Sequence, residues 1–446
     1  MSLLIFNVTI FTNNDKVGII SNGALAIEKS QIIAIGPQQD LKKKYSHFSQ
    51  IDGRGRLLMP GFVNAHMHFY STFARGIAMQ GSPKNFSEIL QMLWWKLDSV
   101  LDLEAVYYSA LVPAISAVKN GITSVIDHHA SPNAVDGSLD KIEDALVKVG
   151  LRASLCYEVS DRDGQAISDA GLAENERYIK KCQALKNQDE AHLFDGMIGL
   201  HASFTLENNT LEKAGALIQN LEKGCHIHVL EDKADQKVTQ KKYGMGVINR
   251  LRYFQILRPE TIAVHCIHLS EKDKDSLAES GAIVVHNPQS NMNNTVGRTD
   301  IFGLLERGIR LGLGTDGMSP NLMNDIRAAN LIHKHDLRQS TVGWTEIEKM
   351  VLQNNPAIFE KVTGQQVGKL EEGALADVIL VDYFAPTPLT ADNFWGHYLF
   401  GIADALVDTT IINGKIVMQN KEIVGIDELA IARKSIEVAK QVWDKF

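Results

Sequence analysis

The feature that most restricts the fold is an alternation of short apolar runs with longer helical stretches, repeated eight times. This alternation is typical of β-α units around a parallel sheet. Eight such units over about 260 residues match the size of a closed (β/α)8 TIM barrel. An open doubly wound sheet is the alternative, but the Gly-rich phosphate loop expected there is absent from the sequence. The apolar runs are Pro60–His66, Thr123–His128, Arg152–Glu158, Asp195–His201, Gly224–Glu231, Thr261–His265, Ala282–His286 and Arg310–Asp316.

The two ends of the chain carry strand patterns of another kind. Near the start, short apolar segments are separated by polar turns, and near the end Asn413-Gly414 predicts a hairpin. The first segment is too short to bury a good core alone. We therefore expect an α/β protein in which residues 1–58 and 368–446 form a small β-sandwich domain with a C-terminal helix. Residues 59–367 would form the catalytic barrel.

Composition excludes several classes of protein. The 446 residues include 45 Lys and Arg and 53 Asp and Glu, a net charge of −8. A mildly acidic surface argues against a nucleic-acid binder or a protein held on an anionic membrane. The four cysteines form no CxxC pair, and no stretch reaches the roughly 18 apolar residues of a membrane helix. With no secretory signal recognised, we expect a cytoplasmic protein.

Histidine and carboxylate side chains stand at the end of every apolar run. In a barrel, the C-terminal ends of the strands form the active-site face. His66 and His68 lie two residues apart in an extended segment, which places both imidazoles on one side. Imidazole and carboxylate ligands suit zinc and iron. The residues that end the runs or follow them closely are His66, His68, His128, His129, Glu158, His201, His228, Glu231, His265, His286 and Asp316.

These motifs resemble those of the amidohydrolase superfamily. Pro60–His68 is similar to the first-strand motif of that family, and Arg75-Gly76 fits after it. Further on, the match is to the branch of heterocycle deaminases and chlorohydrolases. It rests on His228–Glu231, Val264–Cys266, Ser290-Asn291, Gly314–Gly317 and the Gly373–Asp377 tail. Asp127–Pro132 is most similar to the aminohydrolases called SsnA, whose substrate the resemblance does not supply.

The resemblance implies a role for each matching residue. One divalent metal would be held by His66, His68, His228 and Asp316, with zinc favoured and iron the alternative. The absence of a lysine from Gly196–His201 favours a single metal over two. Glu231, His265 and Asp316 would be catalytic. Substrate contacts are implied for His201, Arg75, His128, His129, Ser290 and Asn291.

The implied reaction is hydrolytic removal of an amino group from a nitrogen heterocycle such as a purine, pterin or pyrimidine derivative. Hydroxide on the metal would attack the carbon of the C–N bond, Glu231 would protonate the ring, and His265 would polarise the bond. A chlorohydrolase or cyclic-amide hydrolase acting on a triazine- or hydantoin-like ring is the alternative, followed by a non-catalytic metal-binding relative. The expected partner is a small heterocyclic substrate, with no nucleic acid and no membrane. Relatives are often homodimers or larger homo-oligomers.

The remaining conspicuous residues have structural interpretations. His226 is expected to face the helices, opposite to His228, and His333 and His335 are expected to be solvated. Trp94 and Trp95 could cover the substrate pocket or pack in the core. A supporting role of Glu158 at the site is the less favoured interpretation. For His286, a site role and a structural role are left as alternatives.

Overall fold

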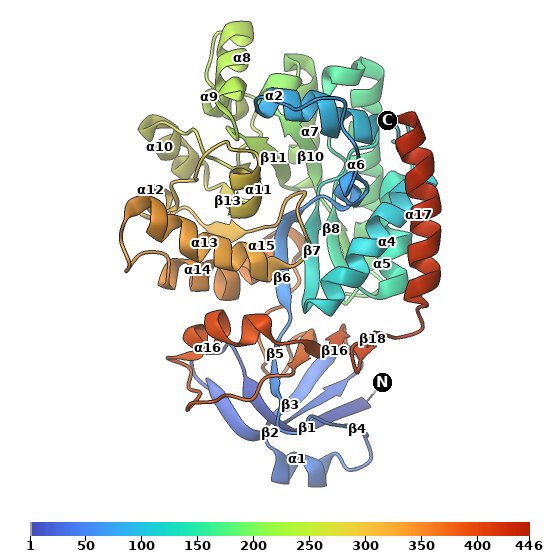
Figure 1. Ribbon diagram of the computed structural model, residues 1–446, viewed down its shortest axis with the longest axis vertical. Coiled ribbons are helices and arrows are strands. Elements are labelled where there is room, and N and C mark those ends of the chain that lie inside the picture. The colour runs from blue at the N-terminus through green and yellow to red at the C-terminus, as the bar shows by residue number, and fades with distance from the viewer. Residues whose placement is uncertain (1) are drawn as a thin grey trace.

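The structure is a computed structural model that describes residues 2–446, a mixed α/β fold (Figure 1). Among these residues, no single helix is long and apolar enough to cross a membrane. Only the segments 86–99 and 103–119 pass that test together, and they are bent by 112° at the break between them.

The strands at the two ends of the chain pair in one nine-stranded sheet. Its order is β18-β17-β16-β15-β5-β1-β2-β3, with β4 beside β1. Val378 of β15 lies opposite Pro60 of β5, which joins the C-terminal strands to the N-terminal ones. The pairing connects all nine strands and does not by itself show the two facing sheets of the expected sandwich. The strands are β1 (Ser2–Phe11), β2 (Ile19–Glu28), β3 (Gln31–Pro37), β4 (Ser49–Asp52), β5 (Leu57–Pro60), β15 (Val378–Val381), β16 (Val407–Ile412), β17 (Lys415–Gln419) and β18 (Glu422–Ile423).

The predicted hairpin near the C-terminal end is confirmed. Ile412 of β16 pairs with Lys415 of β17 across a two-residue turn. Asn413 and Gly414 both have positive φ angles, 52° and 71°. A tight hairpin turn with this backbone twist favours Asn-Gly, because these residues tolerate the left-handed region.

Each of the eight apolar runs overlaps at least one strand, and neighbouring strands within each sheet pair in parallel. They form two sheets, β6-β7-β8-β9 and β10-β11-β12-β13-β14. The run Asp195–His201 is divided between the sheets, and single bridges from Met67 to Asp316 and from Val159 to Leu200 link them. The strands are β6 (Phe62–Met67), β7 (Ile122–Asp127), β8 (Arg152–Leu155), β9 (Phe194–Gly196), β10 (Ile198–Ala202), β11 (Cys225–Val229), β12 (Ile262–His265), β13 (Ile283–His286) and β14 (Leu311–Leu313).

Helices surround the parallel strands, and α17 (Glu428–Lys445) lies along α4 (Leu103–Lys119) (Figure 1). The other helices are α1 (Gln38–Lys44), α2 (Phe86–Ile89), α3 (Trp95–Ser99), α5 (Ser138–Val149), α6 (Gln165–Lys186), α7 (Asn208–Leu221), α8 (Lys233–Tyr243), α9 (Val247–Tyr253), α10 (Glu271–Ser280), α11 (Pro288–Asn293), α12 (Ile301–Leu305), α13 (Leu322–Leu337), α14 (Thr345–Lys349), α15 (Asn355–Thr363) and α16 (Phe394–Phe400).

A buried ion pair connects the parallel strands to the nine-stranded sheet. Arg152 of β8 donates from Nε and Nη2 to the two carboxylate oxygens of Asp377, at 2.9 and 3.0 Å. Its Nη1 donates to Oε1 of Gln365 at 2.9 Å. Both charged side chains are almost fully buried. Because a bidentate pair fixes direction as well as distance, it holds the start of β15 against β8.

Candidate metal centre and substrate cavity

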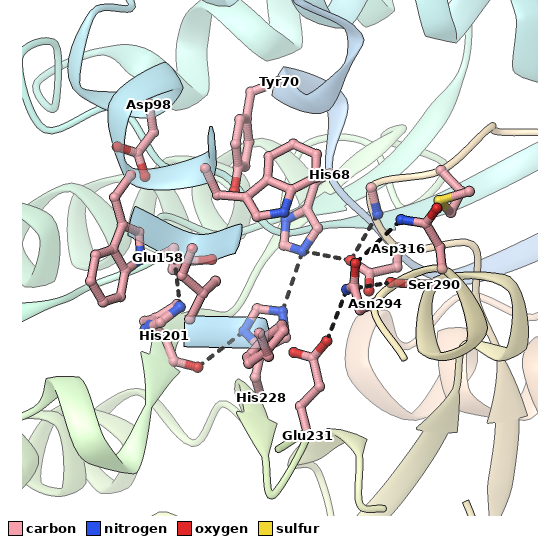
Figure 2. Close-up of a pocket in the computed structure, with 17 residues that line it drawn as sticks. His68, Tyr70, Asp98, Glu158, His201, His228, Glu231, Ser290, Asn294 and Asp316 are labelled. Carbon is pink, nitrogen blue, oxygen red and sulfur yellow. Dashed lines mark hydrogen bonds and ion pairs between the residues drawn. The ribbon is translucent and has the colours of Figure 1, made fainter. Parts of the chain in front are cut away.

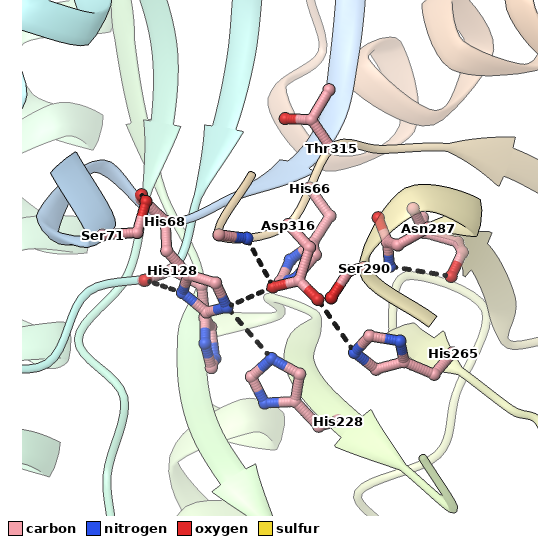
Figure 3. A network of polar contacts seen from close by, with 12 residues as sticks. His66, His68, Ser71, His128, His228, His265, Asn287, Ser290, Thr315 and Asp316 are labelled. Carbon is pink, nitrogen blue, oxygen red and sulfur yellow. Dashed lines mark hydrogen bonds and ion pairs between the residues drawn. The ribbon is translucent and has the colours of Figure 1, made fainter. Parts of the chain in front are cut away.

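Four side chains from distant parts of the sequence meet at the carboxyl ends of the parallel strands (Figure 3). Asp316 Oδ1 lies 3.1 Å from His68 Nε2 and 3.6 Å from His66 Nε2. His228 Nε2 lies 3.3 Å from His68 Nε2. All four residues are buried. Three imidazole nitrogens and a carboxylate at this spacing are a donor set that suits a divalent metal.

Backbone carbonyls fix the tautomers of two of these imidazoles. His68 donates from Nδ1 to the carbonyl oxygen of His128 at 2.6 Å, and His228 donates from Nδ1 to that of His201 at 3.0 Å. A carbonyl oxygen only accepts, so the proton of each neutral ring sits on Nδ1. The lone pair of each ring is then on Nε2, directed towards Asp316. Hydrogen bonds of this kind orient histidines that bind metals.

His226 has the corresponding contact with His66, and the sequence-based orientation of His226 was wrong. Residues two apart on a strand share a face, so His226 points inward like His228. His226 Nε2 lies 2.9 Å from His66 Nδ1, and its Nδ1 lies 3.8 Å from the sulfur of Cys156. The Cys156 thiol donates to the Asp127 carbonyl, leaving the sulfur to accept from His226 Nδ1. His66 therefore donates from Nδ1, and its lone pair is on Nε2.

An unpaired nitrogen atom and a shifted pKa in this cluster indicate that the residues fit a metal ion. His66 Nε2 is buried and has no hydrogen-bond partner among residues 2–446. Burial lowers the pKa of His66 to about 3, which keeps that ring neutral. Although burial opposes it, hydrogen bonding to Asp316 raises the pKa of His68 to about 9. Without a metal the cluster thus attracts a proton, a sign that it favours a positive charge at its centre.

His265 and Glu231 flank this cluster. His265 Nε2 lies 3.4 Å from Glu231 Oε2 and 3.5 Å from Asp316 Oδ2. Its Nδ1 lies 2.8 Å from Oδ1 of Asn291, which accepts the hydrogen bond. Burial raises the pKa of Glu231 to about 7. A carboxyl group with a pKa near neutrality can both give and take a proton at physiological pH.

The backbone at His265 is in the left-handed region, with φ 69°, and Cys266 follows at φ 51°. Such a conformation costs energy for a residue other than glycine. The hydroxyl of Thr299 donates to the carbonyl oxygen of His265 at 2.8 Å. Thr299 therefore helps to hold the strained carbonyl, and with it the direction of the imidazole.

A cavity opens beside the cluster, with an empty volume of about 600 Å³ that includes open solvent (Figure 2). Ten of its 17 lining residues are polar or charged, and Tyr70, Phe86, Trp94 and Trp95 add aromatic surface. The lining residues are His68, Tyr70, Phe86, Leu90, Trp94, Trp95, Asp98, Glu158, His201, His228, Glu231, Ser290, Asn293, Asn294, Asp316, Gly317 and Met318.

The residues expected to contact substrate lie in different places. His201 and Ser290 line the cavity. Asn291 does not line it and instead contacts His265 Nδ1. His128 and His129 are fully buried and do not line it. Arg75 lies on the exposed surface after the short 3-10 helix Phe69–Ala74 and does not line it either.

Two further sequence-based assignments need comment. His333 was expected to be solvated, but it is fully buried, with Nε2 3.3 Å from His286 Nε2. It lies on the inner face of α13, where the surrounding charged residues of the sequence hid its burial. Glu158 lines the cavity and was undervalued, although its position at the end of the third apolar run carried the signal. Asn294, one turn after Ser290, also lines the cavity and had no signal of its own.

Comparison with known proteins gives relatives over the full length. The chain is 30% identical over 446 residues to a 5'-deoxyadenosine deaminase of Methanosarcina mazei, covering 99% of this chain and 98% of that protein. It is 29% identical over 426 residues to a 5-methylthioadenosine/S-adenosylhomocysteine deaminase of Desulforudis audaxviator, covering 94% of this chain and 95% of that protein.

Solved structures with a similar fold include an adenosine deaminase from Xanthomonas campestris with bound zinc. The TM-score is 0.82 at 22% identity, over 99% of this chain and 98% of that one. An atrazine chlorohydrolase from Arthrobacter aurescens complexed with zinc has a TM-score of 0.80 at 20% identity, over 98% of this chain and 100% of that one. The sequence profile of the amidohydrolase family matches residues 57–417. The chain therefore belongs to the amidohydrolase family.

Proposed function

We propose that this protein is a metal-dependent aminohydrolase that removes an amino group from a nitrogen heterocycle such as a purine, pterin or pyrimidine derivative. One observation carries the proposal. The lone pairs of His66, His68 and His228 converge on Asp316 beside Glu231 and His265, at the wall of the cavity. Full-length relatives named as deaminases of adenosine derivatives support the same reaction class.

The proposed architecture is a single (β/α)8 barrel of residues 59–367, with residues 1–58 and 368–446 forming a second domain. The bridges Met67–Asp316 and Val159–Leu200 support closure, because they connect the two parallel sheets on both sides. Closure would place all the strand ends that carry polar residues around one opening.

The proposed ligands of one divalent metal are His66, His68, His228 and Asp316. Zinc is favoured and iron is the alternative, because imidazole with carboxylate suits both. A cation bound there would supply an acidified water molecule as the nucleophile, because such an ion lowers the pKa of its water from about 15.7 towards about 7.

Protein groups would then handle the protons. Asp316 Oδ2 and His265 Nε2 are 3.5 Å apart, so a proton taken by the carboxylate can pass to the imidazole. Because His265 donates its Nδ1 proton to Asn291, it must first take up a proton at Nε2 before it can donate towards substrate. Glu231, whose pKa is raised to about 7, is placed to protonate a ring nitrogen, and the proton that passes from Asp316 to His265 is the one available to the leaving amine.

An ammonia-release screen over purines, pterins, pyrimidines and hydantoins tests the proposed function. The Glu231→Gln variant should keep its metal and its fold while turnover falls by at least about 10²-fold. Unchanged turnover in Glu231→Gln would refute the assignment of that residue. Chloride release from a chlorinated triazine without ammonia release would favour the chlorohydrolase alternative. Less than about half an equivalent of metal per chain, in protein purified without chelator, would favour a non-catalytic relative.

A further inference from the structure

One end of the cavity is lined by side chains that accept hydrogen bonds. Glu158, three residues after the end of β8, has Oε2 2.9 Å from His128 Nδ1 and Oε1 3.8 Å from His201 Nε2. Figure 2 shows Glu158, His201 and Asp98 together at this end. Asp316, Ser290 and Asn294 lie at the opposite end, with His68 and His228 between. The cavity therefore has a proposed reaction end and a second end that borders it, because the ligand atoms of Glu158, His128, His68 and His228 all lie within 4.8 Å of one another.

The tautomer of His201 makes its Nε2 an acceptor. The hydroxyl of Thr205 donates to the carbonyl oxygen of Ala202 at 3.0 Å. That hydroxyl must then accept from His201 Nδ1, which lies 2.7 Å away. A neutral His201 therefore carries its lone pair on Nε2, facing Glu158 Oε1. Two acceptors 3.8 Å apart can both take a hydrogen bond from a donor group placed beside them.

His128 does not supply that donor to Oε1. His128 Nε2 lies 3.0 Å from the carbonyl oxygen of His226 and must donate to it. The contact of His128 Nδ1 with Glu158 is on the other carboxylate oxygen, Oε2. That contact is close, but His128 Nδ1 has no hydrogen-bond partner among residues 2–446, and Oε1 is left beside His201 Nε2.

Asp98 gives an independent observation at the same end. Its side chain is 1% exposed, and Arg162 pairs with Oδ2. Oδ1 has no hydrogen-bond partner among residues 2–446, although Asp98 lines the cavity. A buried carboxylate oxygen without a donor is costly, so a ligand donor there gains the full interaction.

We propose that Glu158 and His201, with Asp98, form a subsite that binds hydrogen-bond donors of the substrate. The substrate would be a heterocycle that carries N–H groups, on the ring or as a second amino group, on the edge opposite to the C–N bond that is hydrolysed. Glu158 is the residue that sets this preference, because a hydrogen bond to a charged acceptor is stronger than one to a neutral acceptor. The inference rests on the proposed function for which bond is hydrolysed, whereas ligand binding at the subsite requires no turnover.

Calorimetric binding to the metal-loaded protein tests the subsite. The probes are 2,6-diaminopurine, adenine and 9-methyladenine, which lose N–H donors in that order. The wild-type affinity should fall by roughly 10- to 100-fold along the series, the range for charge-assisted hydrogen bonds. In Glu158→Gln the three affinities should lie within about threefold of one another, with metal content unchanged.

Glu174→Gln is the matched control. Glu174 is also a buried glutamate, 3% exposed, and it pairs with Arg177 on α6 instead of lining the cavity. This variant should reproduce the wild-type series.

Three outcomes would overturn the subsite. The first is equal affinity of the wild type for all three purines, or no binding of any of them. The second is an equal loss of affinity for all three purines in Glu158→Gln. The third is a fall from two metal equivalents per chain to one in Glu158→Gln. The last result would mean that Glu158 and His128 hold a second ion. A graded series without ammonia release from any heterocycle would instead refute the proposed function and leave the subsite standing. Ammonia release from a heterocycle, together with equal affinities for the three purines, would refute the subsite and leave the proposed function standing.

Discussion

Replacing His226 should weaken metal binding even though His226 is not a proposed ligand. His66 and His226 are both fully buried, and 2.9 Å separates His66 Nδ1 from His226 Nε2. In His226→Phe the acceptor is lost, so His66 either keeps an unsatisfied N–H or moves its proton to Nε2, the atom directed at the metal. Loss of a partner that orients a metal-binding histidine typically costs 10- to 100-fold in affinity.

The same change should also lower stability. A buried donor without a partner costs about 1–3 kcal/mol. This cost is already present in the metal-free protein, so unfolding without metal measures it separately from the loss of metal affinity. Metal-free His226→Phe should unfold at a denaturant concentration lower than that for metal-free wild type. The metal-bound form should show a larger difference, because the lost affinity, about 1.4–2.8 kcal/mol, adds to it.

Competition with a chromogenic chelator measures the zinc affinity, and urea unfolding with and without metal measures the stability. His226→Gln is the control, because its carbonyl oxygen can stand near the position of His226 Nε2 and accept from His66. It should retain affinity within about threefold. If His226→Phe binds zinc as tightly as the wild type, His226 does not set the tautomer of His66, and the argument from Cys156 and Asp127 fails with it.

Three further results are expected. Thr299→Val removes the hydroxyl that donates to the His265 carbonyl at 2.8 Å, and should lower stability by about 1–3 kcal/mol and kcat more than KM; unchanged kcat in a stably folded variant would contradict the positioning role. Asn291→Leu leaves His265 Nδ1 without its acceptor and should reduce kcat at full metal content, whereas a loss of metal instead would show that Asn291 supports the ligands. Chelation should lower the melting temperature, since a metal present at about 1,000 times its Kd stabilises the fold by about 4 kcal/mol; an unchanged melting temperature after verified metal removal would contradict a metal that binds the native state.

The sequence located the strand ends well because a buried strand leaves an unmistakable apolar run. His66, His68, His228 and Asp316 could each be placed at such an end, and the structure brings them together. What a single sequence could not show was which side chains reach one another across the sheet. Glu158, at the end of the third run, contacts His128 from the second, and this pairing depends on the register of β7 and β8.

Other errors had local causes. His226 was misplaced by a wrong count of strand periodicity, since residues two apart share a face. His333 was judged from its charged neighbours Lys334, His335 and Asp336, although one face of an amphipathic helix is buried whatever the adjacent residues are. The substrate contact expected of Arg75 stays a prediction, since that residue is exposed and is not among those that line the cavity.

The sheet built from both ends of the chain has a consequence for synthesis on the ribosome. Pro60 pairs with Val378, so roughly 300 further residues must be synthesised after β5 before β15 can pair with its edge. At about 5–20 residues per second, that edge stays open for tens of seconds. An unpaired strand edge is a template for association with other chains. The parallel strands between can fold while the nine-stranded sheet is still half-made, so the nascent chain should be most prone to aggregation, and most dependent on chaperones, just before β15 emerges.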